Sequence, residues 1–140
     1  MLRVLCLLTV FGVSFASNAA EEPSTRFEQH VHPNASRVTE ISYGRVKCMG
    51  CPMYFRFQAS PEFYSELVKR HRLRPLEKPS SQIKKIWKRI KDAQWPEAAL
   101  TAKDSELHWV QFGMEMRSDP IFRLALKEGD VVYFVTSGFF

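Results

Sequence analysis

The alternation of apolar and polar residues predicts strands near both ends of the chain and helices between them. In residues 51–58, Met53, Phe55 and Phe57 alternate with a mixed set, Tyr54, Arg56 and Gln58. This period of two is typical of a strand with one apolar face. The same period returns after residue 110, and the segment KEGD between two apolar runs indicates a final hairpin. The predicted strands cover residues 39–48, 51–58, 110–117, 122–126 and 131–136.

The first helix is predicted to begin at Ser60 and Pro61, which suit the N-cap and the first turn. Phe63, Leu67 and His71 follow at steps of four residues, so they share one side of this helix. We interpret His71, at the end of the helix, as a capping or packing residue.

The second helix has the clearest pattern in the chain, because its apolar residues fall at steps of three and four. These residues are Ile83, Ile86, Trp87 and Ile90, and Ser80 or Ser81 precedes them as a candidate N-cap. The segment between the two helices, which contains Pro75 and Pro79, is predicted to be a linker. Residues 96–103 indicate one short helical turn.

Strands at both ends and helices in the middle predict an α+β domain. We expect an antiparallel sheet of about four to five strands, with the two central helices packed on one face. The predicted core consists of Phe55, Phe57, Phe63, Leu67, Ile83, Ile86, Trp87, Ile90, Phe112, Leu124 and Phe134.

The first nineteen residues have the features of a secretory signal peptide. Arg3 supplies a positive start, an apolar run of thirteen residues follows, and Ser17 and Ala19 fit the small-x-small cleavage rule. The run is too short to span a membrane, and an uncleaved N-terminal anchor is the alternative. The sequence therefore predicts a signal peptide over 1–19, a flexible N-terminal arm over 20–37 and one domain over 38–140. The mature chain is expected to lack a transmembrane segment and to be periplasmic or secreted.

Cys48 and Cys51 are the two cysteines that remain after the leader, and three roles are open to them. A structural disulfide across a hairpin turn suits an oxidising compartment and the geometry of opposed strands, and we favour it. A thiol–disulfide redox protein would place the first cysteine at the start of a helix, whereas a strand pattern follows here. A copper or zinc site could add Met49 and Met53, but a closed zinc site needs two further ligands. No cofactor is therefore assigned.

Positive charge is concentrated in one part of the chain. The formal net charge is +5, and residues 69–91 contain ten Lys or Arg and one acidic residue. On the second helix the cations lie away from the apolar side, which predicts either a solvated face or a surface for an anionic partner. The candidate partner-binding residues are Lys84, Lys85, Lys88, Arg89 and Lys91. Because an exported protein seldom meets nucleic acid, we expect an anionic envelope component or an acidic protein instead.

Catalytic patterns are weak in comparison. The chain contains no nucleophile elbow, zinc-protease helix motif or glycine-rich phosphate loop. Asp104, Glu106 and His108 alternate at the entry to a predicted strand, where acid–base chemistry is conceivable but a solvated side is more typical. The sequence thus favours a non-catalytic binding module over an enzyme.

The runs FQASPEFYSELVKRHRL, WPEAAL and EGDVVYFVTSGFF resemble segments of small exported bacterial domains of uncharacterised function. The resemblance covers residues 55–140 approximately and leaves out Cys48 and Cys51. It implies a bacterial, periplasmic or secreted setting and no particular activity.

Overall fold

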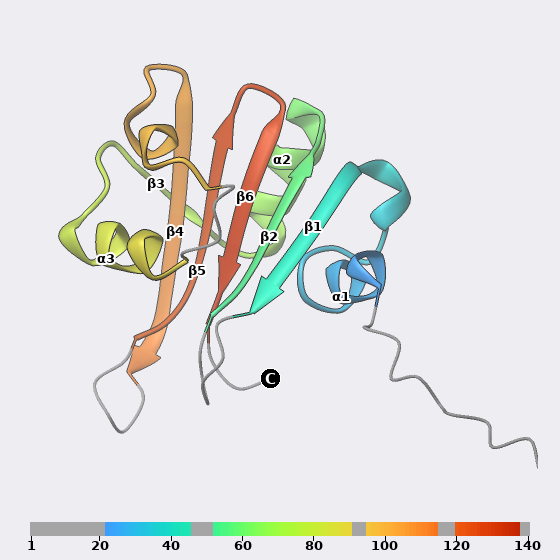
Figure 1. The fold of residues 1–140 in the computed structure, drawn as a ribbon, viewed down its shortest axis with the longest axis horizontal. Coiled ribbons are helices and arrows are strands. Elements are labelled where there is room, and N and C mark those ends of the chain that lie inside the picture. Colours follow the sequence, from blue (N-terminus) through green and yellow to red (C-terminus); the bar gives the residue numbers. More distant parts are fainter. Residues whose placement is uncertain (1–21, 46–51, 91–94, 115–119, 138–140) are drawn as a thin grey trace, which may run out of the picture.

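A computed structural model describes residues 22–45, 52–90, 95–114 and 120–137, which form one six-stranded antiparallel sheet with helices on both sides (Figure 1). The strand order is β1-β2-β6-β5-β4-β3. The strands are β1 (Thr39–Arg45), β2 (Met53–Gln58), β3 (Arg74–Leu76), β4 (Ser105–Met114), β5 (Pro120–Glu128) and β6 (Val131–Thr136). The helices are α1 (Pro23–His30), α2 (Pro61–Arg70) and α3 (Ser81–Arg89), with 3₁₀ turns η1 (Ala35–Arg37) and η2 (Glu97–Thr101). The predicted α+β class and antiparallel sheet are confirmed.

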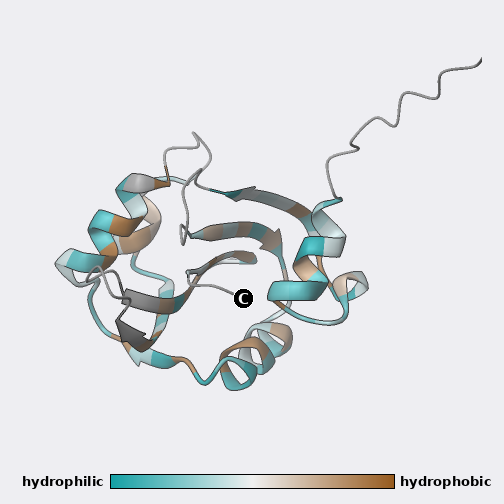
Figure 2. Cartoon of the chain, turned by 90° about the horizontal axis from the view of Figure 1, so that it is seen from below, coloured by the Kyte–Doolittle hydropathy of each residue, from teal (hydrophilic) through white to brown (hydrophobic). Residues whose placement is uncertain are grey.

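The two central helices cover opposite faces of the sheet, so the expectation that both pack on one face is not confirmed. Phe63 of α2 packs with Phe55 and Phe57, whereas Ile83 of α3 packs in a second cluster with Tyr133. Alternate residues of β2, β5 and β6 are buried on both faces, and two apolar faces need two covers. Figure 2 shows α1 and α2 on one side of the curved sheet and α3 on the other. We call the α1–α2 side the first face and the α3 side the second face.

The segment predicted to be a flexible arm contains α1 and η1 and contributes to the core of the first face. Phe27, Val31 and Ala35 are buried there against residues of β2 and α2. These three residues recur every four positions, a helical spacing that the interpretation of residues 20–37 as an arm overlooked because Pro23 and Pro33 interrupt the stretch. Pro23 in fact occupies the first turn of α1, where its missing N–H costs nothing.

The sheet has one strand more than the largest number expected, because the predicted linker contains β3. Arg74 lies opposite Trp109 and Leu76 opposite Leu107, so β3 pairs with the first half of β4. Pro75 stands between them, which is compatible with a strand only at the edge of a sheet.

Most of the predicted core is confirmed, with one exception. All its members are buried except Phe112, whose surface is 53% exposed. The register of β4 against β5 shifts between Gln111 and Gly113, and Phe112 lies at this irregularity beyond the end of β3. The predicted strand over 110–117 corresponds in its first part to β4, which begins earlier at Ser105, and the irregularity interrupts the predicted alternation at Phe112. The side chain of Phe112 therefore remains half-exposed.

Several predictions fall outside the described residues. The disulfide between Cys48 and Cys51 is one of them, as are the signal peptide and Lys91. The strands that precede and follow the cysteines do pair antiparallel, with Arg45 opposite Met53. In the part of the chain that is described, no helix is long and apolar enough to cross a membrane.

Candidate binding surface

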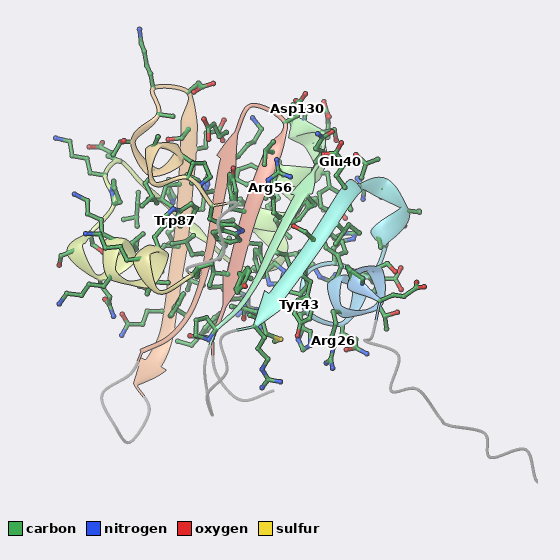
Figure 3. All side chains as sticks on the ribbon, in the orientation of Figure 1. Arg26, Glu40, Tyr43, Arg56, Trp87 and Asp130 are labelled. Carbon is green, nitrogen blue, oxygen red and sulfur yellow. The ribbon has the colours of Figure 1, made fainter. Side chains whose placement is uncertain are left out.

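The orientation of α3 is fixed by contacts on its inner side. Ser80 caps the helix by accepting a hydrogen bond from the backbone N–H of Ile83 at 3.2 Å, as the sequence predicted for this pair of serines. Trp87 is 3% exposed and lies 4.8 Å from Trp95 and 5.5 Å from Tyr133, measured between ring centroids. Its indole N–H donates to the carbonyl of Pro96 at 3.2 Å. Figure 3 shows Trp87 between α3 and the sheet. These contacts prevent the helix from turning about its axis.

The cations of α3 consequently lie on the outer side. Lys84, Lys85 and Lys88 are exposed, whereas the neighbouring Ile83 and Ile86 are buried. Of the other two candidate residues, Arg89 belongs to α3 but its side chain is not among those described, and Lys91 lies outside the described residues. The structure thus brings three of the five predicted residues onto one surface of one helix.

Further cations continue from this surface around the β3 edge of the sheet. The chain passes from the end of α2 on the first face, through β3, to α3 on the second face. The exposed cations on the way are Lys69, Arg70, Arg72, Arg74 and Lys78. The ion pairs found among the described residues involve Glu66 or Glu106, and none includes these cations or those of α3. We call the eight described and exposed cations from Lys69 to Lys88 the basic edge.

Arg72 is held in place by the end of α2. His71 is the C-cap, the N–H of Arg72 bonds to the carbonyl of Lys69, and the N–H of Leu73 bonds to the carbonyl of Val68 at 2.9 Å. This is the Schellman arrangement, in which the residue after the C-cap adopts a left-handed conformation. Arg72 has φ 53°, a region that favours glycine. A bulky cation therefore occupies a position where a glycine would be less strained.

A groove of about 570 Å³ lies beside β4 at the point where β3 begins. Its walls combine two cations with apolar and aromatic side chains. The lining residues are Arg72, Arg74, Pro75, Leu76, Trp109, Val110, Gln111 and Phe112. The side chain of Phe112 is covered on one side by Arg123, whose guanidinium carbon is 5.0 Å from the ring centroid. The groove thus offers positive charge, apolar surface and the edge of a strand together.

A second, more polar cavity of about 420 Å³ lies between α1, the end of α2 and β5. His71 forms its best-defined part: the Nε2–H donates to the carbonyl of Val31 at 2.6 Å, and Nδ1 accepts from Arg123 Nη1 at 3.1 Å. Burial lowers the pKa of His71 to about 4. The imidazole is therefore neutral at physiological pH. His71 is the C-cap of α2 and packs between α1 and β5, which agrees with the prediction of a capping or packing residue.

The residues weighed as an acid–base set do not form one. Glu106 is exposed and lies 3.9 Å from the ammonium of Lys127, while Asp104 precedes β4 at the surface. His108 instead contacts α2: its Nδ1 is 2.9 Å from the hydroxyl of Tyr64, which donates to the carbonyl of Glu106 at 3.0 Å. Burial raises the pKa of Tyr64 and lowers that of His108. Tyr64 stays protonated and joins α2 to the sheet.

Metal ligation finds no support in the described part of the chain, where no group of three His, Cys, Asp or Glu residues could hold an ion.

The groove was not predicted from the sequence. Its residues come from two strands and the turn after α2, and only the position of Arg72 and Arg74 within the basic segment gave a signal.

The comparisons with known proteins add no assignment: no protein-family model matches this sequence, and neither the curated proteins nor the solved structures yield a match.

Proposed function

We propose that this protein is an exported, non-catalytic binding module that engages an anionic envelope component or protein through the outer side of α3. One observation carries the proposal: contacts of Ile83, Ile86 and Trp87 fix the helix, and Lys84, Lys85 and Lys88 project from it without an ion pair among the described residues. A periplasmic or secreted location, and a structural disulfide between Cys48 and Cys51, are parts of the same proposal.

Electrostatics favour an anionic partner at this surface. Lys84 and Lys88 are one helical turn apart, and like charges at this spacing weakly destabilise a helix. A bound anion relieves this repulsion. The interaction is exposed to solvent, so salt weakens it as the screening length falls to about 8 Å at physiological ionic strength.

The test compares two double charge reversals that alter the net charge equally. Lys84→Glu with Lys88→Glu changes α3, and Arg45→Glu with Lys103→Glu changes exposed residues on other elements. The probes are phosphatidylglycerol vesicles and immobilised polyglutamate, measured from low to physiological salt. We expect wild type to bind at least one probe in a salt-dependent manner, the α3 variant to bind about tenfold more weakly, and the control to retain binding.

Equal thermal unfolding midpoints would show that both variants are folded. The proposal is wrong if the folded α3 variant binds as well as wild type, or if wild type binds neither probe. In either case the lysines of α3 are only a solvated face.

A further inference from the structure

The basic edge changes in character along its length. On α3 it consists of lysines, Lys84, Lys85 and Lys88, on the outer side of a helix whose apolar side is buried. At the start of β3 it consists of Arg72 and Arg74, and both of these line the groove. The groove adds aromatic and apolar surface to the charge, so the two parts favour different groups of a partner.

Trp109 supplies aromatic surface in the groove and is the most accessible of the three tryptophans in the chain. Trp87 and Trp95 are buried, whereas Trp109 is half-buried and lines the groove. Phe122 stacks against its ring with 5.2 Å between the centroids and an angle of 21° between the planes. This contact fixes the plane of the indole, and the groove therefore borders a flat, rigid apolar surface.

The register of β3 places a cation beside this ring. Arg74 lies directly opposite Trp109, and opposed residues of antiparallel strands project from the same face of a sheet with Cβ atoms about 5 Å apart. Trp109 packs with the cluster of the second face, so Arg74 belongs to the face that α3 covers. The side chain of Arg74 is exposed and forms no ion pair within the described part of the chain.

The groove and the lysines of α3 are close enough for one extended ligand to contact both. The segment from Arg74 to Ser80 reaches at most about 20 Å, and the first turn of α3, which leads to Lys84, adds about 5 Å. Lys78 is exposed between them in the sequence. A ligand that contacts both parts must be a chain with negative charges at intervals.

The basic edge turns around the sheet and does not lie in one plane. Lys69 and Arg70 stand at the end of α2 on the first face, whereas α3 lies on the second face (Figure 2). A flat bilayer against the outer side of α3 would be on the opposite side of the sheet from these two cations. A flexible linear polyanion can follow the chain around the edge. The shape therefore favours a linear polymer over a membrane surface.

We propose that the groove and the basic edge bind a linear anionic polysaccharide, with one sugar ring against Trp109 and acidic groups at Arg72, Arg74 and the lysines of α3. The inference rests on the proposed function for the anionic nature of the partner and for the role of α3. A sugar ring has an apolar C–H face that packs on an indole, and a guanidinium pairs with a carboxylate or sulfate through two hydrogen bonds. Polyphosphate and polyglutamate carry the charge without such a ring.

The experiment measures binding of size-defined oligosaccharides to the purified protein by calorimetry. Oligogalacturonates carry carboxylates and heparin oligosaccharides carry sulfates, and both are used as tetramers, octamers and dodecamers. The matched controls are an oligogalacturonate with its carboxylates reduced to alcohols and a polyglutamate of equal charge. We expect at least one anionic glycan to bind about tenfold more tightly than this polyglutamate, with an affinity that rises with length until the chain spans both parts of the surface. The reduced glycan should not bind.

Three variants separate the contribution of the ring from that of charge. Trp109→Leu keeps an apolar side chain against Phe122 and should weaken glycan binding about tenfold while binding of polyglutamate stays unchanged. Arg74→Gln should weaken binding of both and reduce its dependence on salt. Lys103→Gln, at an exposed cation outside the basic edge, should change neither. Equal thermal unfolding midpoints would show that the variants are folded.

The wild-type protein provides a readout that needs no substitution. Because Trp109 is the accessible tryptophan, a bound glycan should protect tryptophan fluorescence from quenching by acrylamide, and polyglutamate should not. This measurement decides the role of the ring even if Trp109→Leu unfolds the protein.

The inference is overturned if neither anionic glycan binds more tightly than polyglutamate of equal charge, if folded Trp109→Leu binds the glycans like wild type, or if glycans leave the quenching unchanged. Binding of vesicles or polyglutamate that the α3 double reversal weakens would still support the proposed function in these cases. Conversely, glycan binding that depends on Trp109 and Arg74 but survives the α3 reversal would keep the polysaccharide site in the groove and reject the proposed function of α3.

Discussion

The two ends of the sheet are finished in different ways. At the β1 end, α1 lies beside the strand, and its Phe27 is fully buried among three other phenylalanine rings, the closest at 4.9 Å between centroids. At the β4 end, the cover is a three-residue strand that follows a helix cap, and Phe112 remains half-exposed beside arginines. One end thus contributes to the core, and the other combines exposed cations with a short edge strand.

This difference shows how one sheet can separate stability from recognition. Apolar closure at the β1 end buries surface that stabilises the fold. The β4 end lacks that gain and keeps exposed cations whose mutual repulsion is unfavourable. Under the proposed function, an anionic partner compensates this repulsion. Changes at the two ends should therefore have opposite profiles, with large effects on stability at one and large effects on binding at the other.

The largest expected effect is a loss of stability on truncating a core residue at the β1 end, which we call the closed end because α1 covers it. Phe27→Ala should lower the free energy of unfolding by about 3–5 kcal/mol, because it removes a fully buried ring and leaves a cavity. Phe112→Ala makes the same chemical change at the other end and should alter stability by less than about 0.5 kcal/mol. Urea unfolding of both variants measures the contrast. Similar losses would mean that the two ends are not energetically different.

The next effect concerns His71, which connects the two ends through Val31 of the α1 region and Arg123 of β5. Its pKa in the folded protein is about 4, below the usual value of 6.5, because burial disfavours the charged form. Between these values the unfolded chain binds more protons than the folded one, so stability falls as the pH is lowered from 6.5 to 4. The loss from this group is up to about 3 kcal/mol.

Unfolding measured at several pH values tests this contribution. Arg123, Arg70 and His32 are the charged or titratable groups that oppose protonation of His71. His71→Gln can still donate to the carbonyl of Val31 but does not titrate, so it should flatten the dependence on pH between 6.5 and 4. An unchanged slope in this variant would assign the acid sensitivity to other groups.

The elements that the sequence predicted well are those with local causes. Ser60 and Ser80 accept hydrogen bonds from the third residue of their helices, and the apolar spacing of α3 matches its buried side. The faces that these helices cover could not be predicted, because the choice depends on the crossing of the chain at the β3 edge. Tyr54 and Tyr133 gave a partial signal, since large apolar rings on the second side of a strand need a cover.

The candidate binding surface likewise has one part that could be predicted from local sequence and one part that could not. Exposure of Lys84, Lys85 and Lys88 followed from helical geometry alone, and the structure confirms it. The groove required knowledge of where β3 begins, which is set by the left-handed conformation of Arg72. No sequence rule places an arginine there, because the position after a C-cap usually holds glycine.

A disulfide between Cys48 and Cys51 would further reinforce the closed end, since these residues come between β1 and β2 in the sequence. Intact mass with alkylation, before and after reduction, should show both thiols oxidised in protein that is produced in an oxidising compartment. Replacing both cysteines by serine should lower the free energy of unfolding by about 2 kcal/mol, because the closed loop is short. Free thiols, or stoichiometric copper or zinc in the purified protein, would contradict this prediction.

The smallest expected effect is a gain in stability. Arg72→Gly removes a left-handed arginine, and the free energy of unfolding should rise by up to about 1 kcal/mol after the greater flexibility of glycine in the unfolded chain is subtracted. Glu40→Gly is the matched control at the β1 end, since Glu40 has the same φ of 53°. It loses the hydrogen bond from Gln58 at 2.8 Å, so its gain should be smaller. Only Arg72→Gly removes an exposed cation of the basic edge, so only this variant should weaken binding of polyglutamate. An arginine that costs stability and contributes to binding would show that the basic edge is kept for an anionic partner. A stabilised Arg72→Gly protein with full affinity for polyglutamate would leave the left-handed conformation of Arg72 without a role in binding.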